Sequence, residues 1–243
     1  MQPPVMPYTR PMVSVVIAAF NCAQTIERAA CSAMEQSVTV EIIIVDDAST
    51  DRTWDIINEL AAADSRVRID RCPENSGPSV ARNRGIAAAT GTWIAILDAD
   101  DAFLPGRLQR MTMVGERRDA DLLCDNLACY DWTAQQIVGS ALPLGVDTVT
   151  QVGIEQFICN AMTGRSRFDY GQLKPVVRRD FLLAHCLRYP PDLRHGEDFA
   201  FIMDCLLADA RFTLIGDALY LFTQRIGSIS ADLSGQSRTV VNL

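Results

Sequence analysis

The sequence predicts an α/β fold in which a mostly parallel, twisted sheet is flanked by helices. Two observations predict it. Short, nearly uniformly apolar segments recur at residues 13–20, 41–47, 67–70 and 92–97, and longer segments with helical spacing of apolar residues lie between them. Strands that are apolar on both faces and are joined through helices form parallel sheets. With 243 residues, 49% of them hydrophobic, the chain is long enough to bury a large core.

The first half of the chain, residues 12–118, is expected to be a doubly wound unit. The segment between the first two strands places Ile26, Ala29, Ala30, Ala33 and Met34 at helical spacing. After the second strand, a helix is expected in TWDIINELAAA, capped by one of the three residues Ser49, Thr50 and Asp51. A third helix is expected in VARNRGIAAAT, between the third and fourth strands. Ligands of such sheets bind at the carboxyl ends of the strands.

The second half, residues 119–243, has a less regular pattern. In chain order it predicts a strand and turn in DNLACYDWTAQQIVG, a helix in QVGIEQFICNAM, a strand entering a helix in LKPVVRRDFLLAH, a capped helix in HGEDFAFIMDCLLADA, and a strand or hairpin in FTLIGDALYLFTQR. We find no low-complexity linker and no internal repeat, so we expect one continuous structure.

Acidic residues follow the predicted strands. Asp46 and Asp47 end the second strand, and the sequence DADD, residues 98–101, ends the fourth. Their convergence on one crevice requires cations or hydrogen-bond donors, because buried carboxylates without compensation are costly. In an Asp-x-Asp sequence at a strand end, both carboxylates lie on one side of the pleat. Oxygen ligands without a nearby histidine suit Mg²⁺ or Mn²⁺ shared with a diphosphate. A purely stabilising role for these acids remains the alternative.

Composition excludes several classes of protein. A net charge of −8 argues against a nucleic acid partner, because phosphate binding requires a basic face. The sequence AAFNCA stands where a nicotinamide-dependent oxidoreductase would have Gly-x-Gly-x-x-Gly. A sugar-nucleotide pyrophosphorylase would have a basic, glycine-rich loop after the first strand to bind the triphosphate, and this sequence has none. For the arginines 107, 110, 117, 118, 165 and 167, a solvated surface is favoured over contact with phosphate or a membrane.

Eight cysteines without a Cys-x-x-Cys pair, and only two histidines, argue against a zinc site and predict buried, reduced thiols. The first ten residues lack the apolar core of a secretory signal, and no apolar run approaches the ~18 residues of a membrane span. We therefore expect a cytoplasmic protein, whose membrane contact would be peripheral, at the inner face of the cytoplasmic membrane. The ordinary ending at Leu243 suggests that the native chain is longer.

Four motifs in order resemble the family 2 glycosyltransferases of the GT-A fold over residues 12–225. They are VSVVIAAFN, EIIIVDDASTDRT, NSGPSVARNRGIAAATGTWIAILDADD and HGEDFAF. The resemblance implies a Rossmann-like half, residues 12–118, that binds a nucleotide sugar, continuous with a smaller half, residues 119–243, that binds the acceptor. It also implies transfer of a sugar with inversion at the anomeric carbon.

The resemblance also implies the roles of individual residues on the donor side. Ala19, Phe20 and Asn21 match the segment along the nucleoside, and Asp47 matches the aspartate that accepts a hydrogen bond from the base. Arg82 and Asn83 match the helix start that closes over the nucleotide. Asp98 matches the residue near the ribose, Asp100 the ligand of Mn²⁺ or Mg²⁺, and Asp101 supports both. Arg225 corresponds to a basic residue that reaches the diphosphate, with a surface arginine as an equal alternative.

On the acceptor side, Asp198 in the sequence GED matches the catalytic base of the family, with Glu197 beside it. The alternative is that this sequence only caps the following helix, since acids favour helix N-termini. Trp132 is a candidate platform for an acceptor sugar. His195 is more simply explained as a surface or capping residue and is not assigned a catalytic role.

The chain lacks the Gln-x-x-Arg-Trp motif and the membrane helices of processive polysaccharide synthases, so we expect addition of a single sugar. The resemblance is greatest to exopolysaccharide glycosyltransferases of the succinoglycan type. It implies UDP-glucose as the donor and a saccharide, such as a lipid-linked oligosaccharide, as the acceptor. The alternative is an inactive GT-A module that binds nucleotide or glycan without turnover. The intact Asp98, Asp100 and Asp198 argue against that alternative.

Overall fold

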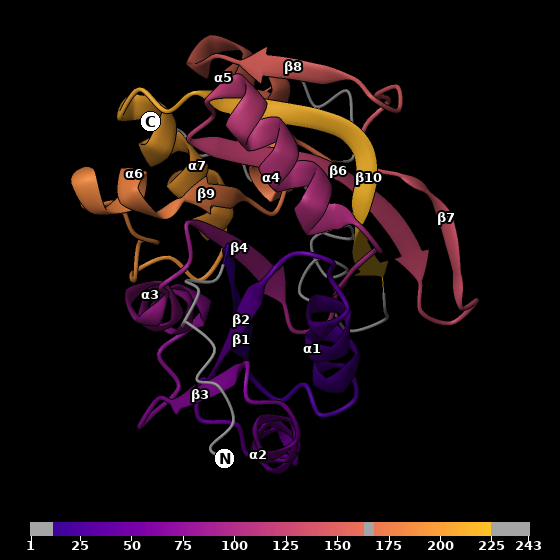
Figure 1. Ribbon diagram of the computed structural model, residues 1–243, viewed down its shortest axis with the longest axis vertical. Coiled ribbons are helices and arrows are strands. Elements are labelled where there is room, and N and C mark those ends of the chain that lie inside the picture. The colour runs from indigo at the N-terminus through magenta and orange to yellow at the C-terminus, as the bar shows by residue number, and fades with distance from the viewer. Residues whose placement is uncertain (1–11, 163–167, 225–243) are drawn as a thin grey trace, which may run out of the picture.

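The computed structural model describes residues 12–162 and 168–224, which form one mixed sheet with helices packed on it (Figure 1). The strands are β1 (Val13–Ala19), β2 (Val40–Asp46), β3 (Val67–Arg71), β4 (Trp93–Asp98), β5 (Ala102–Phe103), β6 (Leu122–Asp131), β7 (Gln136–Ser140), β8 (Val149–Val152), β9 (Val176–Arg178) and β10 (Phe212–Gln224). Their order is β3-β2-β1-β4-β9-β6-β10-β5, with β7 paired to β6 and β8 paired to β10. All the strands of the described residues therefore belong to a single sheet.

The first four strands run parallel, as their apolar pattern predicts. In the register, Val13 of β1 lies between Val40 of β2 and Trp93 of β4, and Ile42 of β2 lies beside Val67 of β3. The side chains of these strands form the centre of the hydrophobic core. Because all four run in one direction, their carboxyl ends lie along a single edge, which brings the polar loops together there.

Helices cover both faces of this parallel part, with α3 on one side and α1 and α2 on the other (Figure 1). In chain order the helices are α1 (Ile26–Met34), α2 (Thr53–Ala63), α3 (Pro78–Ala88), α4 (Arg107–Arg118), α5 (Ile154–Met162), η1 (a 3₁₀-helix, Tyr170–Gln172), α6 (Arg179–Ala184) and α7 (Glu197–Leu207). The N-cap residue of α2 is Arg52, whose side chain forms no cap hydrogen bond, so the expected cap by Ser49, Thr50 or Asp51 is wrong; Asp51 Oδ1, one residue before the cap, accepts a hydrogen bond from Thr53 N at 2.9 Å. At Gly85 of α3, a Cβ atom would lie only 2.4 Å from Val16 Cγ1, so glycine allows this helix to approach β1 closely.

The less regular second half extends the same sheet. The segment expected to be a strand or a hairpin is the single strand β10, which runs parallel to β6 with register shifts between Ile215 and Tyr220. The expected strand and turn after Leu122 is the hairpin of β6 and β7. β5, which belongs to the predicted first half, pairs with β10, and so the two halves share strand pairing.

Helix α4 was not predicted from the sequence, and it corrects the expectation for one arginine. Arg107 is fully buried and forms an ion pair with Asp125 at 2.7 Å, so a solvated position is wrong for this residue. Arg110 is partly buried against Asp217, whereas Arg117 and Arg118 are exposed as expected. Arg165 and Arg167 lie outside the described residues.

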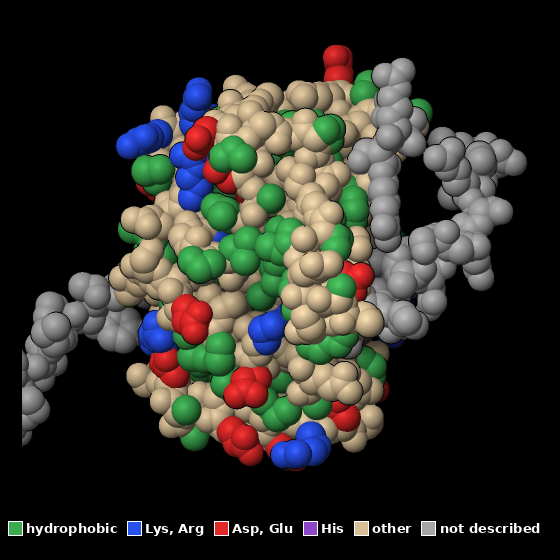
Figure 2. All heavy atoms as spheres, turned by 90° about the vertical axis from the view of Figure 1, so that its right-hand side faces the viewer, with side chains coloured by type: hydrophobic (Ala, Val, Ile, Leu, Met, Phe, Trp, Pro, Cys, Tyr) green, Lys and Arg blue, Asp and Glu red, His purple; other side chains and the backbone are tan. Residues whose placement is uncertain are grey.

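The face at the right of Figure 1 is shown in Figure 2, where apolar side chains gather near its middle and charged ones are scattered around them. β7 lies on this side of the molecule, and its Ile137 and Val138 are 51% and 55% exposed. Within residues 12–162 and 168–224, no helix is both long and apolar enough to span a bilayer.

The cysteines are free, as expected, but not all of them are buried. Cys22, Cys72, Cys124, Cys129 and Cys205 are buried and Cys31 is partly buried, whereas Cys159 and Cys186 are exposed. The prediction of uniformly buried thiols is therefore wrong for the last two, of which Cys159 lies within α5 and Cys186 follows the end of α6.

Burial predicts two classes of thiol reactivity. Burial raises the pKa of the Cys22 and Cys205 thiols to about 12, and only the thiolate reacts rapidly with alkylating reagents. We expect iodoacetamide at pH 8 to modify Cys159 and Cys186 quickly in the folded protein, and Cys22 and Cys205 only after unfolding in urea. Peptide mass mapping measures this, and rapid native labelling of Cys22 would contradict it.

Candidate active site

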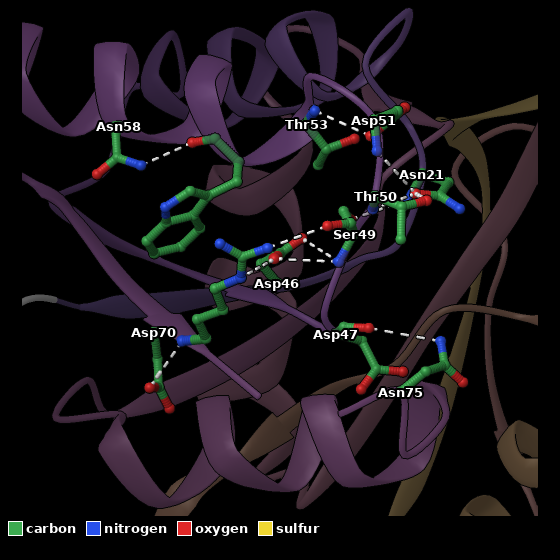
Figure 3. A network of polar contacts seen from close by, with 12 residues as sticks. Asn21, Asp46, Asp47, Ser49, Thr50, Asp51, Thr53, Asn58, Asp70 and Asn75 are labelled. Carbon is green, nitrogen blue, oxygen red and sulfur yellow. Dashed lines mark hydrogen bonds and ion pairs between the residues drawn. The ribbon is translucent and has the colours of Figure 1, made fainter. Parts of the chain in front are cut away.

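The loops after β1 and β2 are joined by a network of polar contacts (Figure 3). Asn21, just after β1, has a positive φ of 47°, which asparagine tolerates better than most residues. Its backbone N–H donates to Ser49 Oγ at 3.0 Å, and its Oδ1 accepts from Thr50 N at 2.9 Å. Both predicted nucleoside-binding segments are thus held in fixed relation at one edge of the sheet.

The two aspartates at the end of β2 have different partners. Asp46 is fully buried and forms an ion pair with Arg71 Nε at 3.0 Å, and the Arg71 guanidinium lies over the Trp54 ring at 4.9 Å from its centroid. Asp47 accepts hydrogen bonds from Ser76 N at 2.9 Å and Gly77 N at 2.8 Å, at the start of α3. Because each carboxylate oxygen can accept more than one hydrogen bond, Asp47 retains acceptor capacity for a ligand.

Five charged side chains from distant parts of the chain form a buried group, here called the central ion cluster. Its members are Arg82 of α3, Asp98 of β4, Lys174 before β9, and Glu197 and Asp198 at the start of α7. Arg82 contacts Asp98 at 2.7 Å and Glu197 at 2.9 Å, and its Nη1 lies 3.6 Å from Asp198 Oδ1. Lys174 Nζ contacts Asp98 Oδ2 at 2.8 Å and Asp198 Oδ2 at 2.5 Å. The cluster therefore joins Asp98, which is predicted to lie near the ribose, to the predicted base.

Electrostatics keep Asp98, Arg82 and Lys174 of this cluster ionised at neutral pH. Burial alone favours the neutral form of each group. For Asp98, however, the charges of Lys174 and Arg82 outweigh burial and hold its pKa well below the usual range of aspartate. In the same way, the charges of Asp198 and Asp98 raise the pKa values of Lys174 and Arg82 despite their burial. Three carboxylates thus share two cations, leaving one negative charge in excess.

The remaining acids of the DADD sequence lie beside the cluster. Asp101 is buried and accepts hydrogen bonds from Tyr220 Oη at 2.8 Å and Thr223 N at 2.7 Å. Burial and the charges of Asp100 and Asp98 raise its pKa well above the usual range of aspartate. The charge of Asp100 thus acts on a neighbouring acid, and carboxylate oxygens are ligands that a hard divalent cation prefers. The described residues contain no group of three or more histidine, cysteine or acidic side chains that could hold a metal alone.

Several other predicted site residues lie close to this edge. The Ala19 carbonyl accepts a hydrogen bond from Asp47 N at 2.8 Å, and Phe20 is 47% exposed. Asn83 forms a reciprocal pair of hydrogen bonds with the Tyr189 backbone, at 2.7 and 2.9 Å. The structure therefore shows Asn83 fixing the segment that leads into α7, and its contact with a nucleotide stays a prediction.

The acceptor-side candidates have the following surroundings. The side chains of Glu197 and Asp198 bind Arg82 and Lys174, so they take part in the cluster beyond any effect on the helix terminus. Trp132 lies beneath Arg28, whose guanidinium is 5.0 Å from its ring centroid, and His195 is exposed. Arg225 lies outside the described residues.

Sequence reasoning missed two residues of the site, Lys174 and Tyr189. Lys174 is the only lysine among the 22 lysines and arginines of the chain, and it is buried. A single lysine in a chain that otherwise uses arginine was a signal that could have identified it. Tyr189 is fully buried, stacks on Phe201 at 4.2 Å and lies 5.1 Å beneath the Arg82 guanidinium. Burial and the charge of Asp198 raise its pKa.

Comparison with known proteins finds relatives over most of the chain. The succinoglycan biosynthesis protein ExoO of Rhizobium meliloti is 38% identical over 223 residues, which are 90% of this chain and 63% of that protein. The succinoglycan biosynthesis protein ExoU of the same organism is 34% identical over 94% of this chain and 65% of its own length. This chain therefore spans less than two thirds of either relative.

Among solved structures, the crystal structure of S. aureus TarS 1-349 in complex with UDP-GlcNAc matches with a TM-score of 0.73 and 22% identity, over 90% of this chain and 60% of that one. This match confirms the expected GT-A fold. A family model described as glycosyl transferase family 2 matches residues 14–181. Because that match covers more than half of the sequence and agrees with the relatives of the whole chain, this chain belongs to glycosyl transferase family 2.

Proposed function

We propose that this chain is a glycosyltransferase that moves one sugar, glucose, from a UDP-linked donor to a saccharide acceptor with inversion at the anomeric carbon. The observation that carries the proposal is the central ion cluster, in which Lys174 joins Asp98, at the end of a parallel strand, to Asp198, at the start of α7. A reaction between a donor and an acceptor needs binding groups for both substrates at one point.

Asp198 is the proposed catalytic base. Inversion requires a group that takes the proton of the acceptor hydroxyl while its oxygen attacks the anomeric carbon. The Oδ2 atom of Asp198 is held by Lys174, whereas Oδ1 is buried and has no hydrogen-bond partner among the described residues. That oxygen has the lone pairs needed to accept a proton.

Asp47 and Asp100 are the proposed contacts of the donor. The carboxylate of Asp47 accepts two backbone hydrogen bonds and has capacity for a third, from the N3–H of a uracil ring. Asp100 would hold Mn²⁺ or Mg²⁺. Such a cation would stabilise the negative charge that develops on the departing diphosphate. The role of Asp98 near the ribose, and the roles of Ala19, Phe20, Asn21, Arg82, Asn83 and Arg225, remain part of the proposal.

The acceptor and the setting follow from the relatives. Both relatives are named as succinoglycan biosynthesis proteins, and each is at least 34% identical to this chain. By analogy, we propose that this chain also acts in exopolysaccharide synthesis, with a lipid-linked oligosaccharide as the acceptor. A protein using such an acceptor would work in the cytoplasm, in peripheral contact with the inner face of the membrane.

The direct test measures binding and hydrolysis of a panel of UDP-, GDP- and TDP-sugars in the presence of Mn²⁺ or Mg²⁺. Titration calorimetry gives the affinities, and chromatography of the released nucleotide gives the turnover. Metal-dependent binding and turnover of a UDP-sugar would support the proposal. If no nucleotide sugar binds, the proposal is wrong, and binding without turnover or transfer would favour the inactive module.

The metal assignment makes a further prediction, for Asp100→Asn. Replacing the proposed carboxylate ligand by an amide should weaken UDP binding in Mn²⁺ by about tenfold or more, since even groups that only support metal ligands are worth about that much. UDP binding in EDTA should stay unchanged. Asp55→Asn, an exposed aspartate on α2, serves as the control. Equal losses with and without metal would contradict the role of Asp100.

A further inference from the structure

We infer that Lys174 is a positioning residue of the transfer reaction, which fixes the base Asp198 against Asp98 by binding Oδ2 and leaves Oδ1 without a hydrogen-bond partner, as the oxygen that takes the acceptor proton. This inference rests on the proposed function and adds to it a residue that no motif of the sequence indicated. Four observations support it: the geometry of the ammonium group, its uniqueness in the chain, the support of its backbone, and the charge of the cluster.

The ammonium group of Lys174 is suited to its place between two carboxylates. It is a compact charge with three donors that can rotate, whereas the donors of an arginine are fixed in one plane. Lys174 Nζ lies 2.8 Å from Asp98 Oδ2 and 2.5 Å from Asp198 Oδ2, so it bridges two residues from different elements. The chain uses arginine at every other cationic position, and its one lysine lies here.

The backbone of Lys174 is held rigidly. The Lys174 carbonyl accepts a hydrogen bond from Arg107 Nη2 at 2.9 Å, and Arg107 is itself fixed by the buried Asp125 at 2.7 Å. The next carbonyl, of Pro175, accepts from Ile96 N of β4 at 3.1 Å. Two hydrogen bonds therefore fix the backbone from which the side chain starts, and the two carboxylates hold its ammonium group, which gives the support that precise orientation of a base requires.

The cluster has more carboxylates than cations. Two cations face three carboxylates, a formal excess of one negative charge. In the proposed step the acceptor oxygen bonds to the anomeric carbon, and its proton moves to Asp198 Oδ1. The bond from that carbon to the diphosphate breaks, and its electron pair leaves with the diphosphate. The ionisable groups around Asp198 are Arg82, Asp98, Cys124, Lys174, Tyr189 and Glu197.

Kinetics of Lys174→Gln test the inference. The variant should lower kcat for transfer by about 100-fold, the cost of a misplaced catalytic group, and leave the donor KM nearly unchanged. Loss of the positive charge should also move the acidic limb of the pH–rate profile upward by about one pH unit or more. Lys174→Arg, which keeps the charge but not the shape, should recover part of kcat. The control is Arg84→Gln. Arg84 lies on the same helix as Arg82 and forms an exposed ion pair with Asp70 of β3, and its replacement should leave the kinetics as in the wild type.

A second measurement tests the geometry without turnover. Protein labelled with ¹³Cε-lysine should give the NMR signal of one lysine side chain, because the chain has one lysine. In the wild type the signal should keep its ammonium shift above pH ~10.4, where an ordinary lysine loses its proton. In Asp198→Asn it should titrate at lower pH, since one of the two charges that raise the pKa of Lys174 is gone.

The possible outcomes separate the two proposals. An active wild-type enzyme whose Lys174→Gln variant keeps both its kcat and its pH profile would overturn the inference and leave the proposed function standing. A loss of thermal stability with normal kcat in the folded variant would likewise make Lys174 only structural. An Asp198→Asn spectrum identical to the wild type would overturn the contact itself. If the wild type turns over no nucleotide sugar, the proposed function fails, and the inference with it.

Discussion

Asp198→Asn is expected to reduce kcat for sugar transfer by about 100- to 10,000-fold, the usual contribution of a general base. The amide has nearly the shape of the carboxylate but cannot take up the acceptor proton. Lys174 and Arg82 would still be held by Asp98, so the fold and the donor site should survive. The dissociation constant of UDP, measured by calorimetry, should therefore equal that of the wild type.

The control for this variant is Asp204→Asn, which changes an exposed aspartate of the same helix, α7. It should have wild-type kcat and KM. An Asp198→Asn variant that retains full transfer would remove Asp198 from the mechanism. A variant that loses UDP binding and transfer together would instead indicate a role for Asp198 in the donor site.

Arg107→Met is expected to lower the free energy of unfolding by about 3–5 kcal/mol, because it leaves the buried charge of Asp125 without its partner. Both side chains are almost entirely inaccessible to solvent, and the guanidinium also lies over the rings of Phe103 and Tyr220, at 4.5 and 5.0 Å. The change also removes the hydrogen bond to the Lys174 carbonyl. Urea unfolding followed by circular dichroism measures the loss.

Two comparisons isolate the cause of that loss. Arg110→Met, on the same helix but partly exposed and paired with Asp217 at 3.1 Å, should cost only about 1 kcal/mol or less. The double variant Arg107→Met with Asp125→Leu should be more stable than Arg107→Met alone, since no buried charge is then left unpaired. A double variant as unstable as the single one would show that packing, rather than the unpaired carboxylate, dominates the effect.

The parallel part of the fold could be predicted from the sequence because its signal is local. Strands such as Val13–Ala19 and Val40–Asp46 are apolar on both faces, and the helices between them repeat their apolar residues at helical spacing. Less regular segments were predicted less well. The sequence does not decide between a strand and a hairpin for β10, because Gly216 and Asp217, where the register shifts, are also typical of a turn. It predicts no helix at α4.

The candidate site was predicted in part, for a related reason. Polar residues at strand ends, with the family motifs, indicated Asp47, Asp98, Asp100 and Asp198 from the sequence alone. The partner of each carboxylate could not be predicted. Asp46 and Asp47 are neighbours in the chain, yet the first pairs with Arg71 and the second with the backbone at Ser76 and Gly77.

The sequence by itself therefore determined the α/β class, the parallel strands and the edge of the sheet where the acids gather. It could do so because the spacing of apolar residues and the presence of turn residues determine the local structure of segments only a few residues long. Only the tertiary structure decided that Lys174 bridges Asp98 and Asp198 and that Arg107 is buried with Asp125. A charged residue can be buried only where an opposite charge meets it, and which residues meet depends on how distant segments pack.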